Sequence, residues 1–146
     1  MFRAICDWIR DEAVALPIGP PWVMDANMFP GFLPQKMSTG ALTPHRCLVV
    51  LQNTPAVVWG HQPDMEDKPI QLWNRSKGYW EAEQDAQDLF DMIHGFCGAN
   101  MQIGAGTQYL AMTIEAMGSP APIENPGPRG FVFSTNYMFR VEEAWC

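Results

Sequence analysis

The sequence predicts an α+β fold, a largely antiparallel β-sheet flanked by two α-helices. Two segments have apolar residues at helical spacing, several others alternate apolar and polar residues, and only the second helical segment could serve as a crossover between strands. We therefore expect the element order α-β-β-β-α-β-β. The 146 residues, 47% of them hydrophobic, are enough for one domain with its own core, and no repeat or boundary divides 1–146.

The first helix is predicted over residues 1–16, where apolar side chains recur at three- and four-residue spacing. These side chains are Phe2, Ile5, Ile9, Ala13 and Leu16. On the outer face, Asp7 can pair with Arg3 at i, i+4 and with Arg10 at i, i+3. Pro17 then ends the helix. The segment is therefore an amphipathic element with one face to bury.

Residues 17–45 are rich in Pro, Gly and Met, and we expect a long apolar loop with a short strand at Trp22–Met24. Two prolines and a glycine argue against a regular element over Met28–Pro34. Long loops are usually functional, and an apolar one either packs on a partner or folds back over its own core. The sequence leaves both alternatives open. The candidates for partner contact are Phe29, Phe32 and Leu33.

Two strands are predicted in the middle of the chain. Arg46–Gln52 has an uninterrupted apolar centre, as in a strand covered on both faces. Residues 53–68 are predicted as a loop, and Pro69–Arg75 as a strand with Ile70 and Leu72 on one face.

Trp73 and Arg75 lie on the other face of that strand and are candidates for a subunit interface. Arg75 would pair with Glu81 or with a neighbouring subunit. The alternative is ordinary packing of both residues against the first helix.

The second helix is predicted at Tyr79–Ile93. Its apolar stripe consists of Tyr79, Ala82, Ala86, Leu89, Phe90 and Ile93. Five carboxylates are expected on the remaining surface: Glu81, Glu83, Asp85, Asp88 and Asp91. Because the segment contains no basic residue, this surface is either a solvated face or one that repels something negative or attracts something basic.

The last third is predicted to be strands. A short strand at Asn100–Ile103 precedes one at Tyr109–Ala116 whose inward residues would be Leu110, Met112 and Ile114. Residues 118–130, with four prolines, are predicted as a loop. Phe131–Val141 alternates strictly, with the odd-numbered residues facing one way.

Charge and cysteine content narrow the function classes. The net charge of −7 argues against a general nucleic-acid binder, which needs clustered Lys and Arg. The longest apolar run is Cys47–Leu51, far below the ~20 residues of a membrane-spanning helix, and the N-terminus has no apolar signal core. We therefore expect a soluble intracellular protein, or one that is assembled inside a cell. The cysteines form no Cys-x-x-Cys pair, and we expect neither a metal site nor a cofactor. They are interpreted as small, mostly buried hydrophobes.

Catalytic motifs are missing, and we expect a protein that is not an enzyme. The chain has no P-loop, no Gly-x-Ser-x-Gly and no His-Glu-x-x-His. The alternative of a small enzyme rests on Cys47 with His45 or His94 as nucleophile and base. Cys47 lies in the most apolar strand, where a thiolate is disfavoured.

Several segments resemble the tail terminator and related minor capsid (tail completion) proteins of tailed bacteriophages. Pro69–Arg75 followed by Gly78–Ala82 is similar to that family's strand–turn–helix. Pro34–Lys36 with Arg46–Val50 is similar to its proline-rich approach to the first long strand. Arg129–Phe131 with Ser134–Phe139 is similar to its closing strand. Leu72–Asn74 departs from the commoner pattern, which has a Val before the Arg.

This resemblance implies a structural virion protein with an antiparallel sheet flanked by helices. Such a protein forms a ring, usually of six subunits, that caps the tail tube and joins the tail to the neck or head connector, with DNA only as passing cargo and no membrane. The acidic helix would then be a candidate for the lumen face. The alternative within the same virion is a head-completion or neck adaptor protein.

Overall fold

The computed structural model describes residues 1–34, 40, 42–52, 57–102, 108–123 and 130–144. In chain order the elements are α1 (Phe2–Ala15), β1 (Met28–Pro30), β2 (Cys47–Leu51), β3 (Val57–Trp59), β4 (Gln62–Ser76), α2 (Tyr79–Ile93), β5 (Cys97–Gln102), β6 (Gln108–Ala116), β7 (Ala121–Pro122) and β8 (Phe131–Ala144). The fold is α+β, which confirms the fold class, and the expected order broadly matches.

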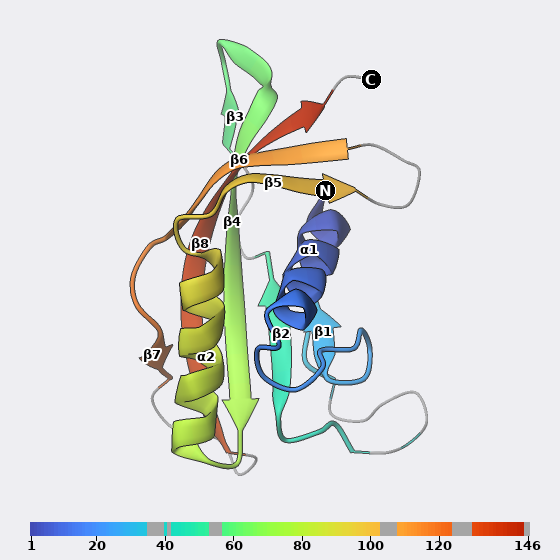
Figure 1. Cartoon of the computed structure of the whole chain (residues 1–146), viewed down its shortest axis with the longest axis vertical. Helices are drawn as coiled ribbons and strands as arrows, with labels where there is room; N and C mark the ends of the chain where they lie inside the picture. The colour runs from blue at the N-terminus through green and yellow to red at the C-terminus, as the bar shows by residue number, and fades with distance from the viewer. Residues whose placement is uncertain (35–39, 41, 53–56, 103–107, 124–129, 145–146) are drawn as a thin grey trace.

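One mixed sheet organises these elements, in the strand order β1-β2-β4-β8-β6-β5. β3 pairs with β4 and β7 pairs with β8, outside this path. Every pair is antiparallel except β1 with β2. The two long strands β4 and β8 form the centre, with Met65–Ser76 alongside Phe131–Glu142. The tip of the β3–β4 hairpin extends past the helices at one end of the molecule (Figure 1).

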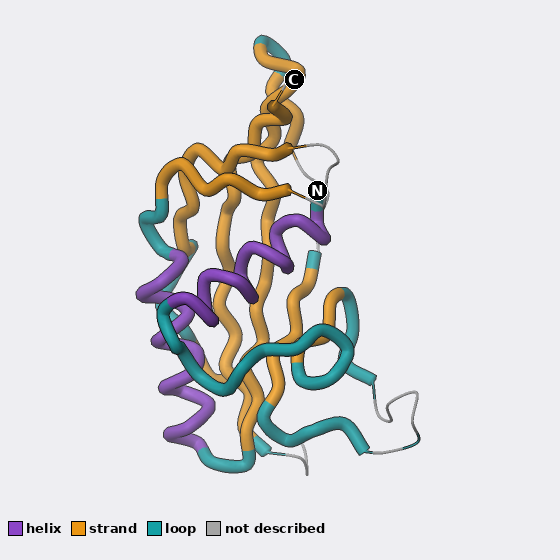
Figure 2. The backbone as a smooth tube through the Cα atoms, turned by 45° about the vertical axis from the view of Figure 1, so that its right-hand side comes forward, coloured by secondary structure: helices purple, strands orange, loops and turns teal. Residues whose placement is uncertain are grey.

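Both helices cover the same face of the sheet (Figures 1 and 2). The main core lies between them and the sheet, where Ile5 and Ile9 of α1 join Leu89 and Ile93 of α2. The strands contribute alternate residues to this core, including Ile70, Leu72, Tyr137 and Phe139. The predicted odd-residue face of β8 is thereby confirmed from Phe133 to Val141.

The first helix is confirmed, with its ends within a residue of those predicted. Both expected ion pairs form, at 3.8 Å between Arg3 Nε and Asp7 Oδ2 and 3.0 Å between Arg10 Nη1 and Asp7 Oδ1. Leu16 follows the end of the helix and is exposed rather than buried.

Two regions predicted to be irregular form strands. Met28–Pro30 pairs in parallel with Leu48–Val50, although the prolines of this segment argued against a regular element. The prediction of a loop over 53–68 is also wrong for the described part, because β3 and the first half of β4 form a hairpin there. Pro69 lies between the part of β4 that pairs with β3 and the part that pairs with β2, so β8 is its ladder partner on one side and neither β2 nor β3 pairs with it on the other. Proline is tolerated at such a position because the missing N–H is not needed for a second ladder.

A β-bulge changes the register of β6. Ala111 is opposite Val141 and Thr113 is opposite Arg140, so Met112 is the extra residue. As a result Ala111 and Ile114 are buried whereas Met112 is exposed, and the expected inward position of Met112 is wrong. The expected strand at Asn100–Ile103 begins earlier, as β5; its last residue, Ile103, lies outside the described residues.

Candidate functional site

The carboxylates of α2 do not share one solvated face. Asp85 points toward the sheet with 3% of its side chain exposed, whereas the other four residues are exposed or half-buried. The expectation of a five-carboxylate surface, and of a lumen face that includes Asp85, is therefore wrong. Asp85 follows the buried Ala82 by three residues and precedes the buried Leu89 by four, so helical spacing puts all three on one side.

Arg46, immediately before β2, neutralises Asp85. Its Nε donates to Asp85 Oδ2 at 2.8 Å and its Nη2 donates to Oδ1 at 2.7 Å, which is the bidentate geometry of strong Arg–carboxylate pairs. Its Nη1 also lies 3.6 Å from Glu81 Oε2. The hydrogen bond to Asp85 raises the pKa of Arg46 above its ordinary value. The guanidinium therefore ties α2 to the start of β2.

The first turn of α2 is held by the end of β4. Ser76 Oγ donates to Glu81 Oε1 and accepts from the backbone N–H of Gly78 at 3.4 Å. Gly130 approaches the same place from the start of β8, where an added Cβ would lie 2.2 Å from the Ser76 carbonyl oxygen. Glu81 is thus a structural residue of this junction as well as an exposed carboxylate.

Arg75 is buried and binds the backbone instead of Glu81. Its Nε donates to the carbonyl oxygen of His45 at 3.3 Å and its Nη2 donates to that of Pro44 at 2.8 Å. The expected Arg75–Glu81 pair is therefore wrong, and Arg46 occupies that role. The physical reason is the alternation of β4, which places Arg75 on the sheet face opposite to α2.

The other predicted interface residues differ in accessibility. Phe29 is buried in β1 beside Val49 of β2, so it is not available to a partner. Trp73 is half-buried opposite Val49 and Ser134, and its indole nitrogen is buried with no hydrogen-bond partner among the described residues. Leu33 is half-buried. Phe32, by contrast, is 68% exposed just after the edge strand β1.

An apolar hollow of about 150 Å³ lies at the C-terminal end of α1. It is lined by Ala13, Val14, Pro17, Ile18, Gly19, Pro20 and Pro21, none of which carries a charge. An apolar cavity of about this volume accommodates benzene. From the sequence Pro17 is recognisable only as a helix stop, because the shape of the hollow depends on how residues 17–21 pack against the helix.

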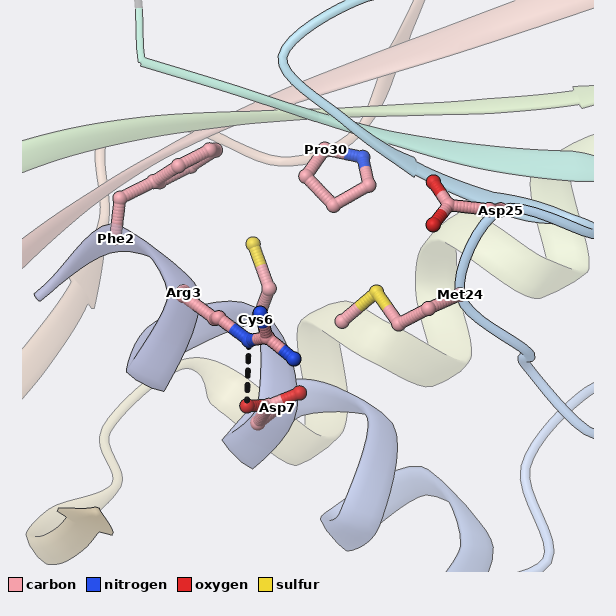
Figure 3. A pocket seen from close by; sticks show the side chains of 7 residues that line it. All are labelled: Phe2, Arg3, Cys6, Asp7, Met24, Asp25 and Pro30. Carbon is pink, nitrogen blue, oxygen red and sulfur yellow. Dashed lines mark ion pairs between the residues drawn. The ribbon is translucent and has the colours of Figure 1, made fainter. Parts of the chain in front are cut away.

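A second cavity, of about 200 Å³, lies between the start of α1 and residues 24–30 (Figure 3). Its lining contains Phe2, Arg3, Cys6, Asp7, Met24, Asp25 and Pro30. Cys6 points its sulfur into this space (Figure 3). Burial, followed by the negative charge of Asp7, raises the pKa of Cys6 to about 12. The thiol is therefore protonated at neutral pH and is a poor nucleophile there.

The residues of the enzyme alternative differ in burial and in hydrogen bonding. Cys47 is fully buried, and burial raises the pKa of its thiol. His45 is exposed, and His94, which follows the last residue of α2, is exposed as well. His94 Nδ1 accepts from the backbone N–H of Ala116 at 2.9 Å. Within the described parts of the chain, no group of three or more His, Cys, Asp or Glu side chains could hold a metal ion.

An aromatic cluster, which the sequence analysis did not single out, lies at the start of α2. The ring of Tyr79 packs edge-to-face on Trp80, Phe131 and Phe133, with centroid distances of 5.1, 5.5 and 5.1 Å. Phe133 is buried, whereas Trp80 is 77% exposed. Trp80 lies outside the apolar stripe of the helix, and its exposure could have been inferred from that position in the sequence.

Comparison of the chain with protein-family models, with curated proteins and with solved structures found no match. Neither described helix has the length and apolar character needed to cross a membrane.

Proposed function

We propose that this chain is a structural subunit of a ring that caps the tail tube of a bacteriophage and joins it to the neck or head connector. The resemblance of Pro69–Arg75 and Gly78–Ala82 to the tail terminator family supports this proposal. The α+β fold, with both helices on one face of a mostly antiparallel sheet, agrees with the fold that the resemblance implies.

Ring formation is supported by two features on different parts of one subunit, namely an exposed aromatic side chain and an apolar hollow that could accept it. Phe32 is 68% exposed at the β1 edge of the sheet. The hollow of about 150 Å³ lies at the end of α1, and its lining is apolar. Insertion of Phe32 into the hollow of the next copy would be a heterologous contact, which generates a ring when the rotation closes.

In this proposal the protein belongs to the virion tail and is assembled in the host cytoplasm. The resemblance implies six copies, with the tail tube protein on one side and neck or head-connector proteins on the other. DNA passes through as cargo. A neutral or acidic inner surface suits this role, and the chain carries a net charge of −7.

Sedimentation velocity of the purified full-length chain, alone and with assembled tail tubes, tests the proposal. We expect a closed oligomer in at least one condition. Phe32→Ala should raise the concentration for half-assembly by at least about tenfold, because buried aromatic anchors dominate interfaces. Val14→Asp, at the rim of the hollow, should act in the same direction.

Met117→Ala is the matched control, since Met117 is an exposed apolar residue that belongs to neither half of this contact. Combining Phe32→Ala with Val14→Asp should weaken assembly no more than the stronger single change, because both remove the same contact. A chain that stays monomeric in both conditions would refute the ring, and unchanged assembly of Phe32→Ala would refute this contact.

A further inference from the structure

We propose that the outward surface of α2 is a docking site for a Lys- or Arg-rich segment of a partner protein, anchored by Trp80. This surface, called here the Trp80 face, consists of Trp80, Glu83, Gln84, Gln87, Asp88 and Asp91. It is separate from Phe32 and from the hollow at the end of α1, so the inference goes beyond the proposed ring and does not rest on it.

The apolar anchor of the face is a rigidly supported indole. Trp80 is 77% exposed, and Tyr79 packs against it edge-to-face at 5.1 Å. Tyr79 is itself fixed by Phe131 and Phe133 of β8. An exposed tryptophan held in this way loses little conformational freedom when a partner covers it, and Trp is among the residues that most often dominate binding.

Helical spacing places the anchor and the polar residues on one side. Trp80, Gln84, Gln87 and Asp91 follow at intervals of four, three and four, so they form one stripe. The stripe spans twelve residues, about 16 Å along the axis from Trp80 to Asp91. A partner segment of about three helical turns therefore matches its length.

The charge of the face is negative and is not compensated within the described residues. α2 contains five carboxylates and no basic residue. Arg46 forms ion pairs with Asp85 and Glu81, and Asp88 contributes more weakly to the raised pKa of Arg46 without an ion pair to it. Glu83, Asp88 and Asp91 have no ion pair with a cation of the described chain. Gln84 donates to Asp88 at 2.7 Å and Gln87 donates to Asp91 at 2.8 Å, and these bonds hold the carboxylates on this side.

Charge complementarity selects the occupant. A second copy of the chain has a net charge of −7, and duplex DNA is also negative, so both are repelled from the face. A basic protein segment satisfies the carboxylates and can cover Trp80 with the aliphatic stems of Lys or Arg or with an apolar side chain. A lumen surface along which DNA only slides does not need an exposed indole. The exposure of Trp80 therefore favours a docking role for the Trp80 face over a role in lining a lumen.

Fluorescence anisotropy with the full-length chain tests this inference. The probe is a labelled 14-residue peptide of Lys and Leu at helical spacing, and the same peptide with Glu in place of Lys is its counterpart. We expect saturable binding of the Lys peptide that weakens with rising salt, and no binding of the Glu peptide. Trp80→Ala should weaken binding by about thirtyfold. Met117→Ala, an exposed apolar change that belongs neither to the Trp80 face nor to the ring contact, should leave it unchanged.

The charge contribution is tested separately. Asp88→Asn with Asp91→Asn should weaken the binding and reduce its dependence on salt, whereas Asp11→Asn on α1 should not. Because Trp80 and Asp91 are exposed, thermal melting should show these variants folded like the parent.

Four results would overturn the inference: equal affinity of Trp80→Ala, binding of the Glu peptide, binding of duplex DNA that Trp80→Ala abolishes, or self-association lost in Trp80→Ala. Failure of ring assembly with normal peptide binding would refute the proposed function alone.

Discussion

Removal of Arg46 should destabilise the fold far more than its surface position suggests. In Arg46→Ala the carboxylate of Asp85, which has 3% of its side chain exposed in the parent, loses its two charged hydrogen bonds. Leaving a buried charge unpaired costs about 3–5 kcal/mol. For a chain of this size that corresponds to a fall in Tm of about 10 °C or more.

Asp85→Ala should lower the free energy of unfolding by less than Arg46→Ala does, and the difference between the two variants is the sharper test. In Asp85→Ala the Arg46 side chain, 37% exposed, can rehydrate and still lies near Glu81 at 3.6 Å. We therefore expect a cost of about 1–2 kcal/mol. The double variant should be no less stable than Arg46→Ala, because it removes the orphaned carboxylate.

Urea unfolding followed by circular dichroism measures all of these free energies. Arg10→Ala is the control, because Arg10 makes comparable pairs with Asp7 and Asp11 on the surface of α1 and should contribute at most about 1 kcal/mol. A cost below about 1 kcal/mol for Arg46→Ala, or strict additivity in the double variant, would refute the account of Asp85 as a buried, dependent charge.

Two further predictions concern the core and the α2 junction. Gly130→Ala should cost at least about 2 kcal/mol in urea unfolding, since φ is +115° and the new Cβ would overlap the Ser76 carbonyl, whereas Gly118→Ala, with open space around it, should change stability by less than about 0.5 kcal/mol. Because the pKa of Cys6 is about 12 when folded and 9.0 ordinarily, the folded state holds this proton more tightly. The protonated thiol of Cys6 therefore contributes fully to the free energy of unfolding below about pH 9, and this contribution is lost as the pH rises toward 12. Cys6→Ala should flatten that decline in a series of unfolding measurements against pH, and an unchanged slope would contradict the assignment.

Local amphipathic patterns allowed much of the fold to be predicted. Ile5 and Ile9 recur at helical spacing and pack in the core, and the odd residues of β8 alternate as predicted. The prolines misled the prediction at Met28–Pro30, because Pro30 lies in an edge strand that has a ladder partner on one side only. That circumstance depends on strand order, which a local pattern does not contain.

The candidate sites were less accessible from the sequence. Arg46 and Asp85 are 39 residues apart, and only the docking of α2 on the sheet brings them together. Phe29 and Phe32 have similar sequence surroundings, yet one is buried beside Val49 and the other is exposed. The acidic side chains were found on α2, but Trp80 gained its significance only when the structure showed its exposure.

Negative-stain electron microscopy of the purified chain, alone and bound to assembled tail tubes, tests the central claim most directly. The account predicts closed rings with a central channel, seated on the tube ends when tubes are present, and their loss in Phe32→Ala but not in Met117→Ala. Isolated particles of monomer size in both samples, with bare tube ends, would contradict it.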